Sequence, residues 1–310
     1  MRNLGSSGLR VSEVGLGCNN FGARVTDVEI TRRVVDKAID LGITLFDTAD
    51  VYGNKGGSET QLGQILGNRR KLIVLATKFG MQMNSPEEKG ASRSYIMNAV
   101  EASLRRLRTD WIDLYQLHQA DPLTPIEETL RALDDLIRQG KVRYIGCSNV
   151  PAWQVAGAYW TARDLRINGF VSCQDEYSLL VRKIDEELIP ALRHYGLGLL
   201  PYFPLASGLL TGKYSRGRMP EGARLTETKR LADRYLTESN WSKVDRLAAF
   251  CAERGHSMLE LAFSWLLARP TVASVIAGAT NPEQLEQNIK AAEWRLMPED
   301  LAEIDRITSG

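Results

Sequence analysis

The chain is short of the residues that mark metal, disulfide and membrane proteins. Among 310 residues there are only three histidines, too few for a site built from several imidazoles. It also has four cysteines: Cys18, Cys147, Cys173 and Cys251. These form no CxxC pair and no metal-ligand spacing, so we expect reduced thiols buried at strand ends.

Excess charge and long apolar runs are lacking as well. Lys and Arg number 39 against 38 Asp and Glu, a balance that gives no sign of a nucleic-acid or membrane partner. No uncharged apolar run is long enough to span a bilayer, and the first residues, Met1 to Gly5, lack the apolar core of a secretion signal. We expect a cytoplasmic protein.

Strand-like runs alternate with amphipathic, helix-length segments along the chain, which predicts a parallel sheet with crossover helices. The expected strands are Val14 to Gly17, Thr44 to Asp47, Leu72 to Thr77, Ile112 to Leu117, Val142 to Ser148, Phe170 to Gln174, Leu199 to Phe203 and Ser274 to Ala277. The expected helices are Asp27 to Leu41, Ser58 to Leu66, Arg93 to Leu107, Pro125 to Gln139, Pro151 to Asp164, Ile184 to His194, Met258 to Ala268, Pro282 to Ala292 and Pro298 to Ile307.

Eight strands suit a closed α/β barrel, so we predict a (β/α)8 TIM barrel over residues 1–310 as a single domain. Leu4 to Leu9 has the turn residues of a β-hairpin that could cap the barrel floor. A long segment, Leu205 to about Asn240, follows the seventh strand and is rich in Lys and Arg. It is either a lid that binds a phosphorylated ligand or a solvated loop.

Four residues able to move protons follow strand-like runs: Asp47, Tyr52, Lys78 and His118. Parallel barrel strands bring their carboxyl ends to one mouth, so these side chains are expected to converge there. An ammonium favours the phenolate form of a tyrosine, a carboxylate keeps that lysine charged, and a neutral imidazole positions a reacting oxygen. The cluster therefore predicts proton donation by Tyr52 to a carbonyl that receives a hydride.

Each of the four residues also has an ordinary structural explanation when taken alone. Asp47 could cap a strand end, Lys78 could be a surface charge, and Tyr52 and His118 could be packed or hydrogen-bonded core residues. Their shared position at strand ends favours catalysis. A metal-dependent barrel hydrolase needs clustered histidines and carboxylates, and His118 stands without them.

These segments resemble the aldo-keto reductase family, and the similarity extends over essentially the whole chain. Besides the four residues, it is carried by the segments Gly140 to Asn149, Gln174 to Tyr177, Pro204 to Tyr214 and Gly278 to Leu285. The resemblance implies a nicotinamide cofactor extended across the barrel mouth without a Rossmann domain. It also implies a cofactor-covering loop after the seventh strand.

The resemblance further implies cofactor contacts, position by position. The carboxamide would be held by Ser148, Asn149 and Gln174, Tyr202 would stack on the nicotinamide ring, and Asp47 would lie near the ribose. The loop over the pyrophosphate would contribute Leu205, Ser207, Leu209 and Lys213. The adenosine end would meet Gly278, Thr280, Gln284, Gln287 and Asn288, with Arg224 at a 2′-phosphate.

The cofactor's identity is less sharply indicated than its presence. Many family members place a lysine and an arginine in the stretch that holds the 2′-phosphate, where this chain has Gly278 and Gln284. Arg224 can compensate, because a guanidinium suits phosphate, and a helix beginning near Asn281 offers free N–H groups. NADP(H) is therefore favoured, and NAD(H) stays open.

Other sequence features are weaker guides. Gly15-Leu16-Gly17 looks like half of a GxGxxG turn, but a first barrel strand explains it better. The expected substrate-pocket residues are Asn19, Asn20, Phe21, Val51, Phe79 and Gln119. The tryptophans expected to pack within helices are Trp153, Trp160, Trp265 and Trp294. Trp241, at the end of the long segment, is a candidate for closing a pocket.

Two functions remain. The first is an NAD(P)H-dependent reductase of an aldehyde or ketone, a small-molecule substrate. The second is a cofactor-binding regulatory or redox-sensing subunit, because the resemblance includes potassium-channel β subunits.

Overall fold

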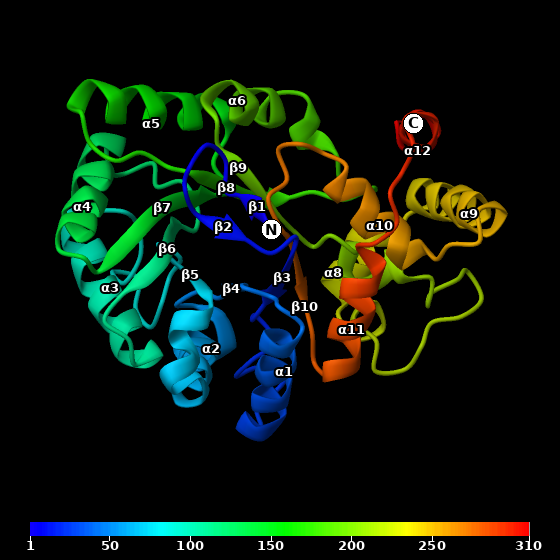
Figure 1. The fold of residues 1–310 in the computed structure, drawn as a ribbon, viewed down its shortest axis with the longest axis horizontal. Coiled ribbons are helices and arrows are strands. Elements are labelled where there is room, and N and C mark those ends of the chain that lie inside the picture. The colour runs from blue at the N-terminus through cyan, green and yellow to red at the C-terminus, as the bar shows by residue number, and fades with distance from the viewer. Residues whose placement is uncertain (310) are drawn as a thin grey trace.

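The protein is a nearly closed barrel of eight parallel strands, as the computed structural model, which describes residues 1–309, shows (Figure 1). The strands pair in the order β10-β3-β4-β5-β6-β7-β8-β9. Their bounds are Val14–Gly17 (β3), Leu45–Asp47 (β4), Val74–Phe79 (β5), Ile112–Leu117 (β6), Val142–Ser148 (β7), Ser172–Glu176 (β8), Gly198–Tyr202 (β9) and Val275–Gly278 (β10). A parallel bridge between Leu199 and Val272 brings β9 against the segment before β10. The predicted (β/α)8 barrel is confirmed.

Helices surround the strands (Figure 1). Their bounds are Val28–Asp40 (α1), Tyr52–Leu66 (α2), Arg93–Leu107 (α3), Ile126–Arg138 (α4), Ala152–Leu165 (α5), Leu188–Tyr195 (α6), Met258–Leu267 (α10), Pro282–Ala291 (α11) and Pro298–Thr308 (α12). The 3₁₀ turns η1 and η2 cover Gly67–Leu72 and Lys183–Asp185. In α4 the buried side chains Leu130, Leu133 and Leu136 recur every third residue, the spacing that places one apolar stripe against the sheet.

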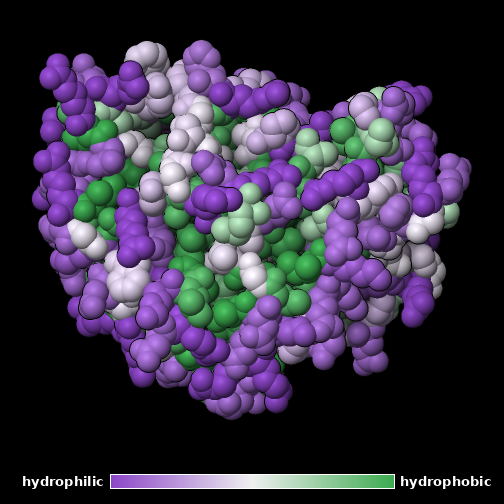
Figure 2. Space-filling view, viewed as in Figure 1, coloured by the Kyte–Doolittle hydropathy of each residue, from purple (hydrophilic) through white to green (hydrophobic). Residues whose placement is uncertain are grey.

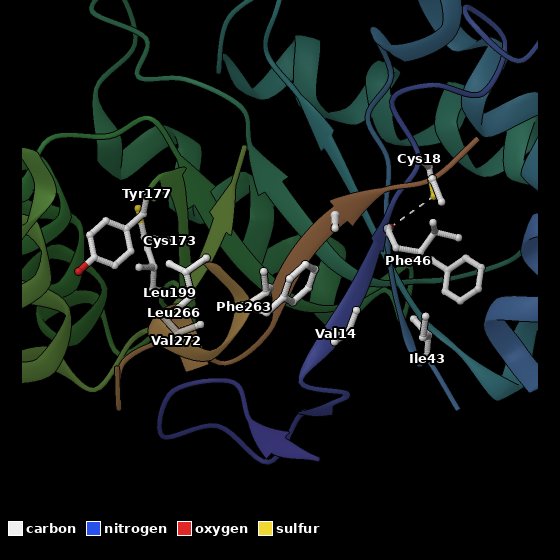
Figure 3. Close-up of a cluster of buried hydrophobic side chains, with 14 of the residues drawn as sticks. Val14, Cys18, Ile43, Phe46, Cys173, Tyr177, Leu199, Phe263, Leu266 and Val272 are labelled. Atoms are coloured by element: carbon white, nitrogen blue, oxygen red, sulfur yellow. Dashed lines mark hydrogen bonds between the residues drawn. The ribbon is translucent and has the colours of Figure 1, made fainter. Parts of the chain in front are cut away.

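The hydrophobic core has two parts. The larger part fills the space between strands and helices, and Figure 3 shows Val14, Phe46 and Leu199 from the strands with Phe263 and Leu266 from α10. The smaller part lies inside the barrel and consists of Leu4, Val11, Leu45, Ala76, Leu114, Leu200, Ala273 and Ile276. Since Leu4 and Val11 belong to the N-terminal hairpin, the hairpin closes one end of the barrel interior.

The hairpin strands β1 (Arg2–Asn3) and β2 (Arg10–Val11) are antiparallel, as predicted for this region. They lie in front of the barrel strands in Figure 1, and on the same face in Figure 2 apolar residues gather toward the centre within a hydrophilic rim. Arg2 fastens the hairpin by donating to Glu13 and to the carbonyls of Leu267 and Val272. The open mouth is therefore at the opposite end.

Strand alternation decides what reaches that mouth. Leu45, Ala76 and Leu114 lie in the apolar interior cluster. Because side chains alternate between the two faces of a strand, the residues two positions later also point inward. These are Asp47, Lys78 and Gln116, all buried. The interior is thus apolar near the hairpin and polar at the carboxyl ends of the strands.

The segment after β9 differs from the expected long loop. It contains the 3₁₀ turn η3 (Ala206–Thr211) and two short helices, α7 (Arg224–Glu227) and α8 (Lys229–Tyr235), and a third helix, α9 (Glu238–Glu253), begins within it. Helices of four and seven residues are too short to show a helical period, because they span two turns or fewer. The long segment between the seventh and eighth barrel strands is present as expected, but it contains short helices that the sequence did not predict.

The tryptophan expectations also need correction. Trp241 is only 7% exposed and packs in the core from α9, so it does not close a pocket. Trp153 and Trp160, expected to pack, are 71% and 59% exposed on α5. Trp265 is buried as expected.

The four cysteines are free and buried, as predicted, although Cys251 lies in α9 rather than at a strand end. Among residues 1–309, no helix has both the length and the apolar character that a membrane crossing requires.

Candidate active site

Asp47 and Lys78 form an ion pair where β4 and β5 approach the barrel mouth. The Lys78 Nζ donates to Asp47 Oδ2 at 2.7 Å and to the Thr48 carbonyl at 2.9 Å. The Lys78 side chain is 0% exposed. A fully buried ammonium persists only when its donors are satisfied and its charge is paired, and this geometry provides both.

Tyr52 joins this pair from the loop beyond β4. Its hydroxyl lies 3.5 Å from Lys78 Nζ. The next four residues, Gly53 to Gly56, all have positive φ, between 59° and 111°. A Cβ on Gly53 would lie 2.3 Å from the Phe21 carbonyl oxygen, so only glycine fits there. This left-handed turn begins α2 irregularly and leaves the Tyr52 ring at the mouth; regular helix follows, as predicted from Ser58.

His118 comes directly after β6 and completes the predicted cluster. Its ring packs edge-on against Tyr52, with 5.6 Å between ring centroids. Nδ1 is buried and has no hydrogen-bond partner among residues 1–309. Burial, helped by the charge of Lys78, lowers the pKa of His118 to about 3. The imidazole is therefore neutral near pH 7.

The pKa values of Lys78 and Tyr52 are set by opposing effects. Burial alone would lower the pKa of Lys78, but the Asp47 carboxylate and the Tyr52 hydroxyl outweigh it, so this pKa is raised. Burial raises the pKa of Tyr52 above its usual value, and the charge of Lys78 only partly offsets this. We expected Lys78 to lower the tyrosine pKa overall. Burial dominates instead, and Tyr52 stays protonated at neutral pH, the form that a proton donor needs.

The residues expected at the carboxamide lie beside this cluster. Gln174 Nε2 donates to Asp47 Oδ1 at 2.9 Å. Asn149, at φ 54°, donates to Ser148 Oγ at 2.9 Å and accepts from the Tyr202 hydroxyl at 2.8 Å. Asn149 also donates to the His118 carbonyl at 3.0 Å, which ties this group to the cluster.

Gln116 is a site residue that the sequence analysis missed. Its Nε2 lies 3.3 Å from Asp47 Oδ1, and its side chain is wholly buried. Strand alternation could have predicted it, because Gln116 lies on β6 two residues before His118 and therefore points to the same side of the strand. A glutamine within a strand-like run has no distinctive motif, so it passed as a core position.

The residues expected at a pyrophosphate fall into two groups. Ser207 and Leu209 are buried in η3; Leu209 is 0% exposed and so offers no surface to a ligand, contrary to expectation. The Ser207 Oγ has no hydrogen-bond partner among residues 1–309. Lys213 is exposed, and Leu205 is partly exposed.

Arg224 stacks over the Phe203 ring, with its guanidinium carbon 5.1 Å from the centroid. The pKa values of Arg224 and Lys213 are both lowered, first by burial and then by the charge of Arg24. Three cations are thus gathered at one place. The guanidinium of Arg24 donates to the Gly222 carbonyl at 3.5 Å. The sequence analysis missed Arg24 because it precedes α1, far in sequence from the long segment.

The expected adenosine-end residues surround the start of α11. Asn281 caps the helix by accepting from Gln284 N at 3.0 Å, and Gln284 Oε1 accepts from Thr280 N at 2.8 Å. The exposed Gly278 ends β10; a Cβ there would lie 3.0 Å from Asn20 Nδ2. Gln287 is exposed and Asn288 is buried.

The expected substrate-pocket residues do not share one environment. Phe21 and Phe79 are 0% exposed and belong to the hydrophobic core, so they present no surface to a substrate, contrary to expectation. Val51 is partly exposed at the start of α2, and Gln119 is exposed just beyond His118. Asn20 is buried, and Gly15 to Gly17 forms β3 rather than a phosphate turn.

Known proteins are similar to this chain over nearly its whole length. The model of the "Aldo/keto reductase family" matches residues 13–309. A "Probable voltage-gated potassium channel subunit beta" from Oryza sativa subsp. japonica is 39% identical over 99% of this chain and 95% of its own. The "Uncharacterized oxidoreductase YrpG" of Bacillus subtilis is 39% identical with the same coverage. An "L-glyceraldehyde 3-phosphate reductase" of Escherichia coli (strain K12) is 36% identical over 98% of this chain and 91% of its own. With its barrel, its buried ion pair and this match, the chain belongs to the aldo/keto reductase family of oxidoreductases.

Proposed function

We propose that the protein reduces an aldehyde or ketone to an alcohol with NADP(H), and that Tyr52 is the general acid. The observation that carries this proposal is the position of Lys78 Nζ, 2.7 Å from Asp47 Oδ2 and 3.5 Å from the Tyr52 hydroxyl. One ammonium thus links the carboxylate to the phenol. Structural roles for the separate residues do not require that link.

The proton chemistry follows from this arrangement. A carbonyl oxygen held between Tyr52 and the neutral imidazole of His118 accepts the tyrosine proton as its carbon becomes an alcohol carbon. The Lys78 ammonium stabilises the phenolate that forms, because opposite charges attract strongly in a buried site. Asp47 keeps Lys78 charged, and the phenolate then regains a proton from water. When bound, the nicotinamide supplies the hydride that the carbonyl carbon receives.

The residues present fit such a cofactor. Because Asp47 can only accept hydrogen bonds, the Gln174 NH₂ group faces it, and the Gln174 carbonyl oxygen is left to accept from a carboxamide. Ser148 and Asn149 would complete that set, Tyr202 would supply the ring that stacks on the nicotinamide, and Asp47 would lie near the ribose. The unpartnered Ser207 hydroxyl suits a phosphate oxygen.

At the adenosine end we assign Gly278, Thr280, Gln284, Gln287 and Asn288. The gathered charges of Arg24, Lys213 and Arg224 support NADP(H) over NAD(H). Burial and then the charge of Arg24 lower the pKa values of Lys213 and Arg224, and a bound anion would offset this repulsion. The neutral Gly278 and Gln284 do not add to this charge, so the preference rests on the three cations.

The decisive experiment is Tyr52→Phe. Removing only the hydroxyl should lower the rate of carbonyl reduction by about a hundredfold to ten-thousandfold, the usual contribution of a general acid. Quenching of NADPH fluorescence should be unchanged, since the ring stays in place. Tyr195→Phe on α6 is the matched control and should keep full activity. Reduction at the normal rate by Tyr52→Phe would refute the proposal.

A second candidate is a cofactor-binding regulatory subunit, which the similarity to potassium-channel β subunits favours. Turnover of NADPH with 4-nitrobenzaldehyde, methylglyoxal and glyceraldehyde 3-phosphate separates the two functions. The phosphorylated aldehyde is included because of the Escherichia coli relative. A regulatory subunit would bind NADPH, show little turnover with any carbonyl and recover a stoichiometric protein partner in a pull-down.

A further inference from the structure

Asp47 is held from three sides, and only two of its partners belong to the proposed machinery. Its Oδ2 accepts from Lys78 Nζ, and its Oδ1 accepts from the amides of Gln174 and Gln116, at 2.9 and 3.3 Å. A carboxylate offers only acceptors, so the NH₂ group of each glutamine must face it. One oxygen is thereby reserved for the amides and the other for the ammonium.

Gln116 lies beside a glycine of the neighbouring strand. On β6, Gln116 pairs in register with Lys78 of β5 and Gly146 of β7. A Cβ on Gly146 would lie 3.3 Å from Gln116 Cγ and 2.5 Å from Ser172 Oγ. The contact with Ser172 is prohibitive and the contact with Gln116 is tight, so the glycine on β7 leaves space that Ser172 and the glutamine side chain share.

Burying Gln116 in the core costs free energy. Its side chain is 0% exposed, and its Oε1 has no hydrogen-bond partner among residues 1–309. An apolar residue of similar size would avoid the cost of an unpaired buried carbonyl. With no exposed surface, Gln116 cannot reach a ligand at the mouth. What it offers is a single N–H directed at Asp47.

We propose that Gln116 is a positioning residue for carbonyl reduction: its amide fixes the Asp47 carboxylate so that Lys78 stays charged beside Tyr52. This inference rests on the proposed function. Without that amide, Asp47 Oδ1 keeps only the bond from Gln174, and the carboxylate can turn more freely about its Cβ–Cγ bond and away from Lys78. Burial lowers the pKa of Lys78 and the contact with Asp47 raises it. Any loss of that contact therefore lowers this pKa. Gln174 cannot replace the lost bond, because its own NH₂ group already donates to Asp47.

The test is the pH dependence of the single-turnover rate with NADPH and an aldehyde. Gln116→Met keeps the side-chain length without the N–H donor. The rate should begin to fall at a pH about one unit lower than in the wild type, because Lys78 deprotonates more readily. NADPH affinity should stay within about twofold, since Gln116 lies beneath the site. Gln61→Met, at another buried glutamine that bonds Thr31 and the Thr26 carbonyl, should leave the profile unshifted.

A second variant keeps the proposal testable if Gln116→Met folds poorly. Gln116→Glu preserves the volume, and when protonated it can still donate to Asp47. Its activity should approach the wild-type rate at acid pH and fall as the new carboxyl ionises. Unshifted profiles for both variants, with Tyr52→Phe inactive, would overturn the role of Gln116 alone. An active Tyr52→Phe would instead overturn the function on which it rests.

Discussion

Buried ionisable side chains at the carboxyl ends of the strands do not all serve the proposed proton transfer. Asp50 lies three residues beyond Asp47, is 1% exposed and borders a cavity of about 520 Å³ along α3. Burial and the nearby carboxylate of Glu59 raise the pKa of Asp50 to about 8. The two nearby aspartates thus differ in their surroundings, although they are the same residue type. Asp47 has an ammonium and two amides as partners, whereas burial keeps Asp50 protonated near neutrality.

The raised pKa of Asp50 predicts a pH-dependent cost to stability. The folded state binds this proton more tightly than the unfolded chain, so stability falls as pH rises from about 4 toward 8, by about 1.4 kcal/mol per unit. Asp50→Asn removes that cost. In urea denaturation the variant should gain stability relative to the wild type as pH rises from 5 to 9. Asp164→Asn, at an exposed position, should show no such trend. A difference for Asp50→Asn that does not change with pH would contradict this assignment.

At the scale of elements, the segment after β9 is fastened to the barrel by one carboxylate. Glu176, at the end of β8, accepts from Arg234 and from the Tyr235 hydroxyl, both on α8. Glu176 and Tyr235 are 6% and 1% exposed, so the bond between them is shielded from water, whereas the Arg234 side chain is 49% exposed. From the other side, Arg24 reaches the segment at Gly222. The segment that carries Lys213 and Arg224 is therefore held at two points, by Glu176 and by Arg24.

Glu176→Gln should loosen this fastening. A neutral amide loses the ion pair with Arg234 and weakens the bond to Tyr235, a loss of roughly 1.5–3 kcal/mol for a charged hydrogen bond. We expect NADPH to dissociate about tenfold faster in stopped-flow measurements, since 1.4 kcal/mol corresponds to a factor of ten. The control is Glu238→Gln, whose carboxylate pairs with Arg216 in the open and is 83% exposed. Equal dissociation rates for the two variants would argue against the fastening.

At the scale of the whole molecule, one end of the barrel contributes to stability and the other end carries the proposed catalytic residues. The hairpin residues Leu4 and Val11 close the apolar end of the interior, while the four proposed catalytic residues lie at the other end. A substitution at the hairpin end of such a barrel can change stability without changing the site, because the two ends are built from different side chains.

Leu4→Ala should therefore destabilise the protein without changing its catalysis. Leu4 is 0% exposed, and its truncation leaves a cavity at the barrel floor worth about 2–5 kcal/mol. Urea denaturation measures this loss, while the KM and kcat for carbonyl reduction should be unaltered below the unfolding transition. Leu123→Ala, at a leucine that is 86% exposed, should change stability by less than about 0.5 kcal/mol. A changed KM in Leu4→Ala would show that the two ends are coupled.

The sequence by itself determined the barrel and the four proposed catalytic residues. Strand periodicity is local, and parallel strands bring their carboxyl ends together regardless of what lies between them, so Asp47, Lys78 and His118 could be placed at one mouth. The match to the aldo/keto reductase family supports the same fold.

Only the tertiary structure decided the contacts that depend on distant partners. Gln116 and Arg24 carry no local motif; their importance comes from Asp47 and Lys213, which lie far away in sequence. The net pKa of Tyr52 depended on how deeply its surroundings bury it, which no spacing reveals. Phe21, Phe79 and Leu209 became core residues, and Trp153 became exposed, because burial is settled by how helices pack against the sheet.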